Sequence, residues 1–145
     1  MDKIYELAKK YRNAIEEAKE EGEFIKDVRF CQFPSGCCDD ACDLLAQYLL
    51  EHGIRTHQVL GAYRDGIFEN NTGHAWLIKG KIIIDITGDQ FRYDRTFLNF
   101  NEPVYVGREN EFYRLFERDR ICENIDIKSN VRLYNLYKTI SKYID

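Results

Sequence analysis

The sequence predicts an α+β fold in which a central helix, starting at a cysteine, packs on a small antiparallel sheet with further helices outside it. Three observations lead to this prediction. Residues 38–52 carry apolar side chains at helical spacing directly after a Pro–Gly turn. Residues 73–79 and 81–87 have the composition of two strands, with a Gly between them suited to a tight turn. Helical spacing recurs at 2–21 and around 131–140.

Length and composition indicate one globular domain, residues 1–145. A chain of 145 residues can bury a sizeable core, and its 44% hydrophobic and 32% charged residues are ordinary for a soluble protein. Nine Gly and two Pro leave little room for a disordered linker. The sequence has no internal repeat and no low-complexity tract.

Charge and hydropathy exclude several partners. The net charge of -4, without a basic stripe, argues against nucleic acid as the main partner. The first residues, Met1–Glu6, form no apolar signal region, and no apolar run approaches the length of a membrane span. Five cysteines, an odd number, cannot all pair within one chain. We therefore expect a cytoplasmic protein with reduced thiols that binds neither nucleic acid nor membrane.

The first helix is expected at residues 2–21, with Gly22 as its stop. A helix packed on the domain is favoured over one that binds a partner, because a helix with one apolar face usually belongs to the core. Residues 23–36 read as irregular and lead to the turn before the first candidate site residue. The apolar positions of this helix are Ile4, Leu7, Ala8, Tyr11, Ile15 and Ala18.

The helix at 38–52 begins at a cysteine, a position that favours chemistry. Unpaired backbone N–H groups and the positive end of the helix dipole gather at a helix start. They stabilise a thiolate, the reactive form of cysteine. Asp39 and Asp40 suit the first helical turn but oppose a thiolate beside them, so histidine must compensate or one Asp must point elsewhere. The expected buried face is Ala41, Leu44, Leu45, Tyr48 and Leu49.

Strands follow this helix. We expect a strand over 54–63, a turn at Arg64–Gly66 and a loop at Glu69–Gly73 before the hairpin 73–79/81–87. The second hairpin strand is apolar on both faces, which predicts a place inside the sheet.

The remaining third of the chain gives weaker signals. Residues 88–107 are rich in turn-forming residues, with a possible short strand at 104–106. Phe112, Leu115 and Phe116 suggest a third helix, and residues 131–140 a fourth.

The hairpin brings a histidine and an aspartate together. If Lys79 and Gly80 form the loop, His74 lies directly opposite Asp85, with Cβ atoms about 4.5–5.5 Å apart. If Gly80 and Lys81 form the loop, the two residues are diagonal neighbours on one face. A three-residue loop would place them on opposite faces.

Asp85 lies within a run of isoleucines, so its carboxylate is expected to be buried and to need a partner. His74 is the nearest candidate. An aspartate that holds a histidine fixes its tautomer and stabilises its protonated form, and such a histidine can take a proton from a cysteine. This is the thiol, base and orienter of an activated nucleophile. The alternative is that His74 is a core histidine and Asp85 its structural partner.

Cys38 is favoured over Cys37 as the nucleophile. The two side chains point about 100° apart on a helix, and Cys38 shares the core-facing side. Cys42 also lies on that face but is too deep in the helix to gain from its N-terminus. Cys31 and Cys122 read as ordinary thiols.

A zinc site is the competing chemistry. The spacing lacks a C-x-x-C pair, and the ligands would crowd one helix, so we expect no metal and no cofactor. The two histidines that could bind such a zinc, His52 and His57, are expected to be exposed. The possible ligands are Cys31, Cys37, Cys38 and Cys42 with His52 or His57.

Three motifs resemble the transglutaminase-like branch of the papain-like cysteine hydrolases. They are F-P-x-G-x-C at Phe33–Cys38, G-H-A-W at Gly73–Trp76 and I-D-I-T at Ile84–Thr87. The resemblance covers about residues 30–93 and implies a cysteine-protease-like core. In that superfamily a cysteine begins the central helix, and histidine and aspartate come from neighbouring antiparallel strands.

The resemblance implies residue roles and a reaction. Cys38 is the nucleophile, His74 the base and Asp85 the orienter; Gln32 lies where such enzymes place an oxyanion-hole glutamine. The implied reaction is attack on an amide or ester carbonyl, with a thioacyl intermediate that water or an amine resolves. The activity would be that of a peptidase, amidase, deamidase or transglutaminase. The substrate would be a peptide, a protein or a small amide.

The chain departs from the family in three respects. Cys37 precedes the nucleophile, no Trp follows it, and the chain is much shorter than true transglutaminases. A non-catalytic binding or regulatory protein on the same fold is therefore the alternative function.

Overall fold

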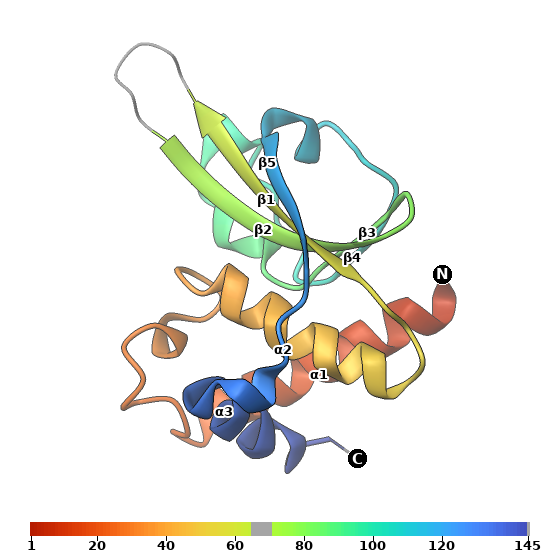
Figure 1. The fold of residues 1–145 in the computed structure, drawn as a ribbon. Helices are drawn as coiled ribbons and strands as arrows, with labels where there is room; N and C mark the ends of the chain where they lie inside the picture. Colours follow the sequence, from red (N-terminus) through yellow and green to blue (C-terminus); the bar gives the residue numbers. More distant parts are fainter. Residues whose placement is uncertain (65–70, 145) are drawn as a thin grey trace.

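The computed structural model describes residues 1–64 and 71–144, and it is α+β as predicted. Three α-helices in these residues gather on one side of a sheet: α1 (Asp2–Glu20), α2 (Cys38–Glu51) and α3 (Val131–Ser141) (Figure 1). The predicted helices at 2–21, 38–52 and 131–140 are confirmed to within a residue. Within the described residues, each helix is too short or too polar to cross a membrane.

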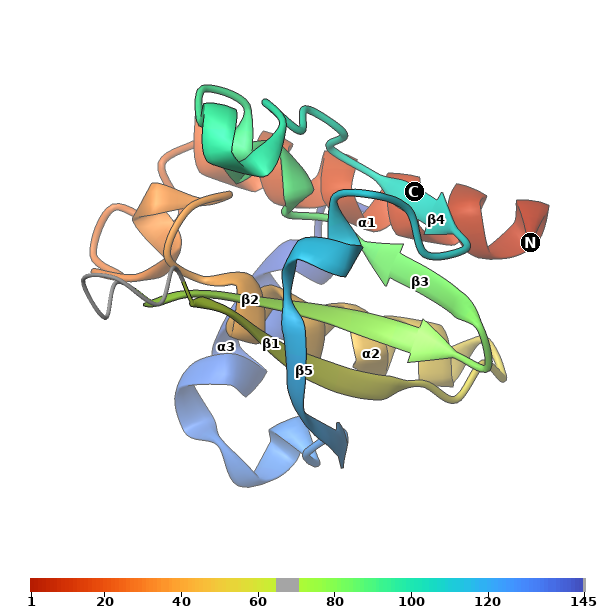
Figure 2. The ribbon, with the colours of Figure 1, turned by 90° about the horizontal axis from the view of Figure 1, so that it is seen from above.

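The sheet is antiparallel throughout, as predicted, with five strands among the described residues in the order β4-β3-β2-β1-β5 (Figure 2). β3 pairs on both sides, which confirms that the isoleucine-rich strand lies inside the sheet. The strands are β1 (His57–Arg64), β2 (Asn71–Lys79), β3 (Ile82–Asp85), β4 (Tyr105–Gly107) and β5 (Glu117–Glu123).

One core lies between the helices and the sheet. α2 crosses this face with its whole predicted apolar side buried, and α1 and α3 pack beside it. The sheet contributes alternate residues of β2 and β3 to this core, because successive side chains of a strand point to opposite faces. Those residues are Ala75, Leu77 and Ile84.

A second core covers the opposite face of the sheet. It consists of one residue from each of β1, β2 and β3 packed against aromatic rings from the irregular segment that follows β3. Rings bury a large apolar area each, so a segment with little regular structure can still close this face. The members of this aromatic core are Val59, Trp76, Ile83, Phe91, Phe97, Phe112, Tyr113 and Phe116.

The predicted helix at 112–116 is wrong. Only a short 3-10 turn, Tyr113–Leu115, is present, and it leads into the edge strand β5. The rings of Phe112 and Phe116 enter the aromatic core from this turn and do not form one face of a helix. β5 was missed because its side chains are mostly charged and exposed, so no apolar alternation marks it.

Strand boundaries also differ from expectation. β1 begins at His57 rather than at residue 54, and the expected short strand at 104–106 is β4 at Tyr105–Gly107. Residues 71–73 of the expected loop Glu69–Gly73 belong to β2, and Arg64 of the expected turn still belongs to β1. Residues 65–70, which hold the rest of that turn and loop, lie outside the described part.

Candidate active site

The turn before α2 presents two adjacent cysteines in different environments. Gly36 has φ +73°, a left-handed conformation that glycine adopts without steric cost. The chain can therefore reverse there, with Cys37 capping α2 and Cys38 as its first residue. Cys37 is buried, whereas Cys38 is half-buried.

Burial makes the neighbouring thiols of Cys37 and Cys42 poor candidates for the nucleophile. Burial, with a smaller effect from Cys38 and nearby aspartates, raises the pKa of Cys37 to about 12. Burial also raises the pKa of Cys42 well above its usual value. A thiol that resists ionisation is a poor nucleophile. The preference for Cys38 over Cys37 therefore has a physical reason in the fold.

The hairpin between β2 and β3 adopts the second of the predicted registers. Leu77 pairs with Ile84 and Lys79 with Ile82, so Gly80 and Lys81 form the loop. The register with His74 directly opposite Asp85 is therefore wrong, and the two residues are diagonal neighbours.

The side chains of His74 and Asp85 still meet. His74 Nε2 lies 2.8 Å from Asp85 Oδ2, and each residue is only 2% exposed. The predicted burial and pairing of Asp85 are confirmed.

Asp85 is held as a carboxylate by several donors. Its Oδ2 also accepts a hydrogen bond from the Tyr113 hydroxyl at 2.8 Å. Its Oδ1 accepts from the Thr87 backbone N–H at 2.9 Å and from the Thr87 hydroxyl at 3.3 Å. Burial alone would raise the pKa of Asp85, but the charge and hydrogen bond of His74 and the other donors outweigh it and lower that pKa.

The same interactions act on His74. Burial disfavours the imidazolium, but the charge and hydrogen bond of Asp85, followed by the effect of the nearby Cys38 side chain, raise the pKa of His74 to about 9. The start of α2 and two neighbouring strands thus bring together Cys38, His74 and Asp85. A thiol, an imidazole and a carboxylate in this order can pass a proton from sulfur to the ring.

The two aspartates beside Cys38 have partners of their own. Asp39 Oδ1 accepts a hydrogen bond from Arg29 at 2.7 Å, and Asp40 Oδ2 accepts one from Arg132 at 2.9 Å. These guanidinium groups offset the carboxylate charges that would otherwise oppose a thiolate.

Gln32 borders the turn that leads to Cys38. It ends the short 3-10 helix Phe30–Gln32 and is exposed. Its Oε1 lies 3.5 Å from the point that a Cβ on Gly36 would occupy. The Gln32 amide is therefore near the start of α2.

Several residues at the site were missed from the sequence. Tyr113 binds Asp85 from a segment expected to be helical, and its separation of 28 residues leaves no local pattern. Gln90 Nε2 lies 3.3 Å from His74 Nδ1. Its place three residues after I-D-I-T, in the next turn, was the only signal available.

A buried ion pair braces the segment that carries Gln90. Arg12 of α1 donates from Nη1 and Nη2 to the two carboxylate oxygens of Asp89, both at 2.8 Å, and from Nη1 to the Ile86 carbonyl oxygen at 2.6 Å. The sequence offered one signal for this brace: Arg12 is a charged residue next to Tyr11 on the apolar side of the first helix.

Comparison with known protein families, curated proteins and solved structures finds no match to this chain. The resemblance at the three motifs and the geometry of the site therefore carry the functional argument by themselves.

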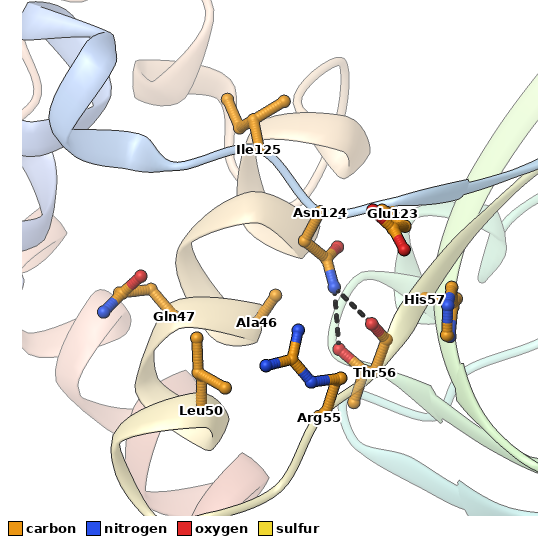
Figure 3. A pocket seen from close by; sticks show the side chains of 9 residues that line it. All are labelled: Ala46, Gln47, Leu50, Arg55, Thr56, His57, Glu123, Asn124 and Ile125. Atoms are coloured by element: carbon orange, nitrogen blue, oxygen red, sulfur yellow. Dashed lines mark hydrogen bonds between the residues drawn. The ribbon is translucent and has the colours of Figure 1, made fainter.

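A pocket lies elsewhere on the molecule. It is formed by the C-terminal half of α2, the start of β1 and the residues at the end of β5 (Figure 3). Asn124 donates there to the Thr56 carbonyl and hydroxyl oxygens at 2.7 and 3.0 Å. No member of the Cys38, His74 and Asp85 group lines it.

The alternative of a zinc site gains no support from the arrangement of side chains. Within residues 1–64 and 71–144, no three His, Cys, Asp or Glu side chains are grouped so as to hold a metal ion. His52 and His57, the candidate histidine ligands, are exposed as expected.

Proposed function

We propose that this protein is a cysteine-dependent hydrolase or acyltransferase that acts on an amide or ester carbonyl. The observation that carries the proposal is the buried pair of His74 and Asp85 next to the Cys38 side chain at the start of α2. A buried His–Asp pair by itself could have a purely structural role. A half-buried thiol at a helix start beside that pair completes the set of groups found in an activated nucleophile: a thiol, a base and a carboxylate that orients the base.

The proposed reaction uses the two ring nitrogens of His74 for different partners. Asp85 occupies His74 Nε2, so the Cys38 proton goes to Nδ1. The Cys38 thiolate attacks the carbonyl carbon, and the tetrahedral intermediate collapses as His74 gives its proton to the leaving amine or alcohol. The resulting thioester is resolved when water or an amine attacks it and transfers a proton to His74. No external cofactor is required for these steps.

Oxyanion stabilisation would come from the start of α2. Backbone N–H groups in the first turn of a helix have no partner within the helix, and that of Cys38 is beside the reacting sulfur. Gln32 borders the same turn and is exposed, so its amide is available as a second donor. This is the role that the family resemblance implies for it.

The arrangement also supports a transglutaminase-like core. A cysteine at the start of a central helix, with histidine and aspartate on adjacent antiparallel strands, is the plan that the three motifs imply. The substrate class would be peptides, proteins or small amides, including glutamine side chains.

Thiol labelling tests the proposal directly. With limiting iodoacetamide at neutral pH, mass spectrometry should find Cys38 labelled before the other four cysteines. His74→Ala should slow that labelling by about tenfold or more, since loss of a positioned base typically costs 10²–10⁴-fold in a catalysed step. Cys122→Ser, at a thiol far along β5, is the matched control and should leave Cys38 labelling unchanged.

Activity is tested with activated esters and glutamine peptides. We expect a thioacyl adduct on Cys38 that is absent in Cys38→Ser. First labelling of Cys37 or Cys122, together with no adduct on folded protein, would contradict the catalytic proposal and favour the binding or regulatory alternative.

A further inference from the structure

The amide of Gln90 occupies the ring nitrogen that the proposed reaction uses. Gln90 lies in the 3-10 turn Gly88–Phe91, directly after the strand that carries Asp85. Its Nε2 is 3.3 Å from His74 Nδ1 and 3.0 Å from the Thr87 carbonyl oxygen. The amide therefore bridges the imidazole and the backbone.

The Thr87 carbonyl determines which way this amide points. A carbonyl oxygen can only accept, so the atom of Gln90 facing it must be the NH₂ nitrogen. The same nitrogen then donates its second hydrogen to His74 Nδ1. A flipped amide would place two oxygens about 3.0 Å apart, at the distance now spanned by the hydrogen bond.

This donor selects one tautomer of the neutral ring. If Nδ1 accepts from Gln90, it carries a lone pair, and Nε2 carries the hydrogen that it donates to Asp85. His74 is then the neutral Nε2–H tautomer. Gln90 and Asp85 together hold the ring in the form that a general base needs.

The same contact opposes the next step. When Nδ1 takes the Cys38 proton, the new ring N–H meets the Gln90 N–H, and two donors face each other. Asp85 on β3 and Cys38 on α2 both favour a protonated ring, whereas Gln90 opposes it. The Tyr113 ring, stacked 6.5 Å from His74, donates its hydroxyl to Asp85 and supplies no charge to offset this conflict.

The Thr87 carbonyl is held firmly in place. It also accepts from the Gln90 backbone N–H at 3.2 Å. Arg12 donates hydrogen bonds on both sides of Thr87, to the Ile86 carbonyl oxygen and to the Asp89 carboxylate. The carbonyl therefore resists moving to accommodate a flipped amide, so the Gln90 side chain itself must turn.

We propose that Gln90 is a positioning residue that favours the neutral Nε2–H form of His74, against Asp85 and Cys38, and that must turn away when the ring is protonated. This inference rests on the proposed function, because it describes the control of the same Cys38–His74 pair. Gln90 is half-buried, so its amide has a route toward solvent or a bound substrate.

The test uses the full-length protein and two readouts that do not depend on a substrate. Nitrogen-15 NMR of the imidazoles reports the His74 tautomer, and the pH dependence of Cys38 alkylation reports formation of the ion pair. Gln90→Met keeps the side-chain length but removes the donor. Gln90→Glu places an acceptor at the same point. Gln47→Met is the matched control, because Gln47 donates to Glu51 on α2, away from His74.

Above the His74 pKa of about 9, where the ring of the unmodified protein is neutral, we expect an unprotonated Nδ1 and a protonated Nε2. Gln90→Met should lower the midpoint pH of Cys38 alkylation by about 0.5–1 unit, the change expected for losing one hydrogen bond. Gln90→Glu should keep the ring protonated to a higher pH than in the unmodified protein. Gln47→Met should change neither readout.

Two results would overturn the inference: a neutral His74 ring whose hydrogen is on Nδ1 in the unmodified protein, or an alkylation midpoint in Gln90→Met that equals that of Gln47→Met. The NMR measurement decides the question even if Gln90→Met does not fold. Failure of the proposed function looks different, because Cys38 would then be unreactive and insensitive to His74→Ala whatever residue stands at position 90.

Discussion

At the scale of single residues, burial decides which side chains keep their usual chemistry. Cys37 and Cys38 are neighbours with the same side chain, yet only Cys37 is buried by the fold. Asp43, one turn after Asp39 on α2, is half-buried. Its own burial, followed by the charges of Asp39 and Asp40, raises its pKa to about 7. The protein therefore carries a carboxyl that the folded state prefers to keep protonated.

Asp43→Asn should stabilise the protein at neutral and alkaline pH. The folded pKa of about 7 lies above the unfolded value, so the folded state binds the proton more tightly. This contribution is fully present below about pH 4 and is lost as pH rises through about 7. The Asn variant should gain about 1–2 kcal/mol in free energy of unfolding at pH 8, a figure discounted for partial exposure.

Urea denaturation between pH 4 and pH 9 measures this effect. The difference between Asp43→Asn and the unmodified protein should grow from about pH 4 to about pH 7 and then stay constant. Glu111→Gln, at an exposed carboxylate, is the control and should show no such trend. A pH-independent difference for Asp43→Asn would contradict the assignment.

At the scale of elements, α1 supports the site without touching its reacting atoms. Arg12 crosses from α1 to the segment after β3, and its partner Asp89 has a side chain only 11% exposed. Burial opposes the charge of Arg12, but the hydrogen bonds and charges of Asp89 and Glu16 outweigh it and raise its pKa. The helix thus holds the turn that carries Gln90.

Arg12→Met should strongly destabilise the protein. The substitution keeps an apolar side chain of similar length but leaves the Asp89 carboxylate buried and unpaired, which typically costs about 3–5 kcal/mol. Denaturant unfolding measures the loss. Lys10→Met, at an exposed position of the same helix, is the matched control.

A double-mutant cycle separates the ion pair from the packing of the arginine side chain. Asp89→Asn in the Arg12→Met background should recover part of the lost stability, because no unpaired charge remains. A loss below about 1 kcal/mol for Arg12→Met alone would indicate that the pair contributes little to stability.

At the scale of the whole molecule, one sheet separates two cores of different kinds. The helices lie on one face of the sheet (Figure 1) and enclose a core of mixed aliphatic and aromatic residues, and the aromatic core closes the other face. Adjacent residues of β2 serve opposite cores: Ala75 and Leu77 face the helices, and Trp76 belongs to the aromatic core. Because β2 and β3 contribute residues to both cores, we expect neither core to be lost without the other.

The chain should therefore unfold in one cooperative step, as a single domain of residues 1–145. Trp76 is the only tryptophan, is fully buried and reports the aromatic core by its fluorescence. Far-UV circular dichroism at 222 nm, about the wavelength of the helical signal, reports the opposite face. The two urea transitions should coincide, since coincident probes indicate a two-state transition. Separate midpoints would show that the cores are independent units.

Local patterns in the sequence determined much of this architecture. The amphipathic spacing of α1, α2 and α3 and the Gly80 hairpin follow from interactions between residues a few positions apart, so their signals are complete in the sequence. The same locality explains the pairing of His74 with Asp85, because both acceptable hairpin registers keep them on one face. The position of Cys38 at a helix start follows from the turn before it.

Only the tertiary structure decided which partners complete the site. Tyr113 reaches Asp85 from an irregular segment, and Arg12 reaches Asp89 across 77 residues of chain. The burial of Cys37 and the contact of Gln90 with His74 likewise depend on how the helices and the sheet come together. Such contacts join residues with no fixed spacing in the sequence, so no periodic pattern records them. They exist only once the two cores have closed around the sheet.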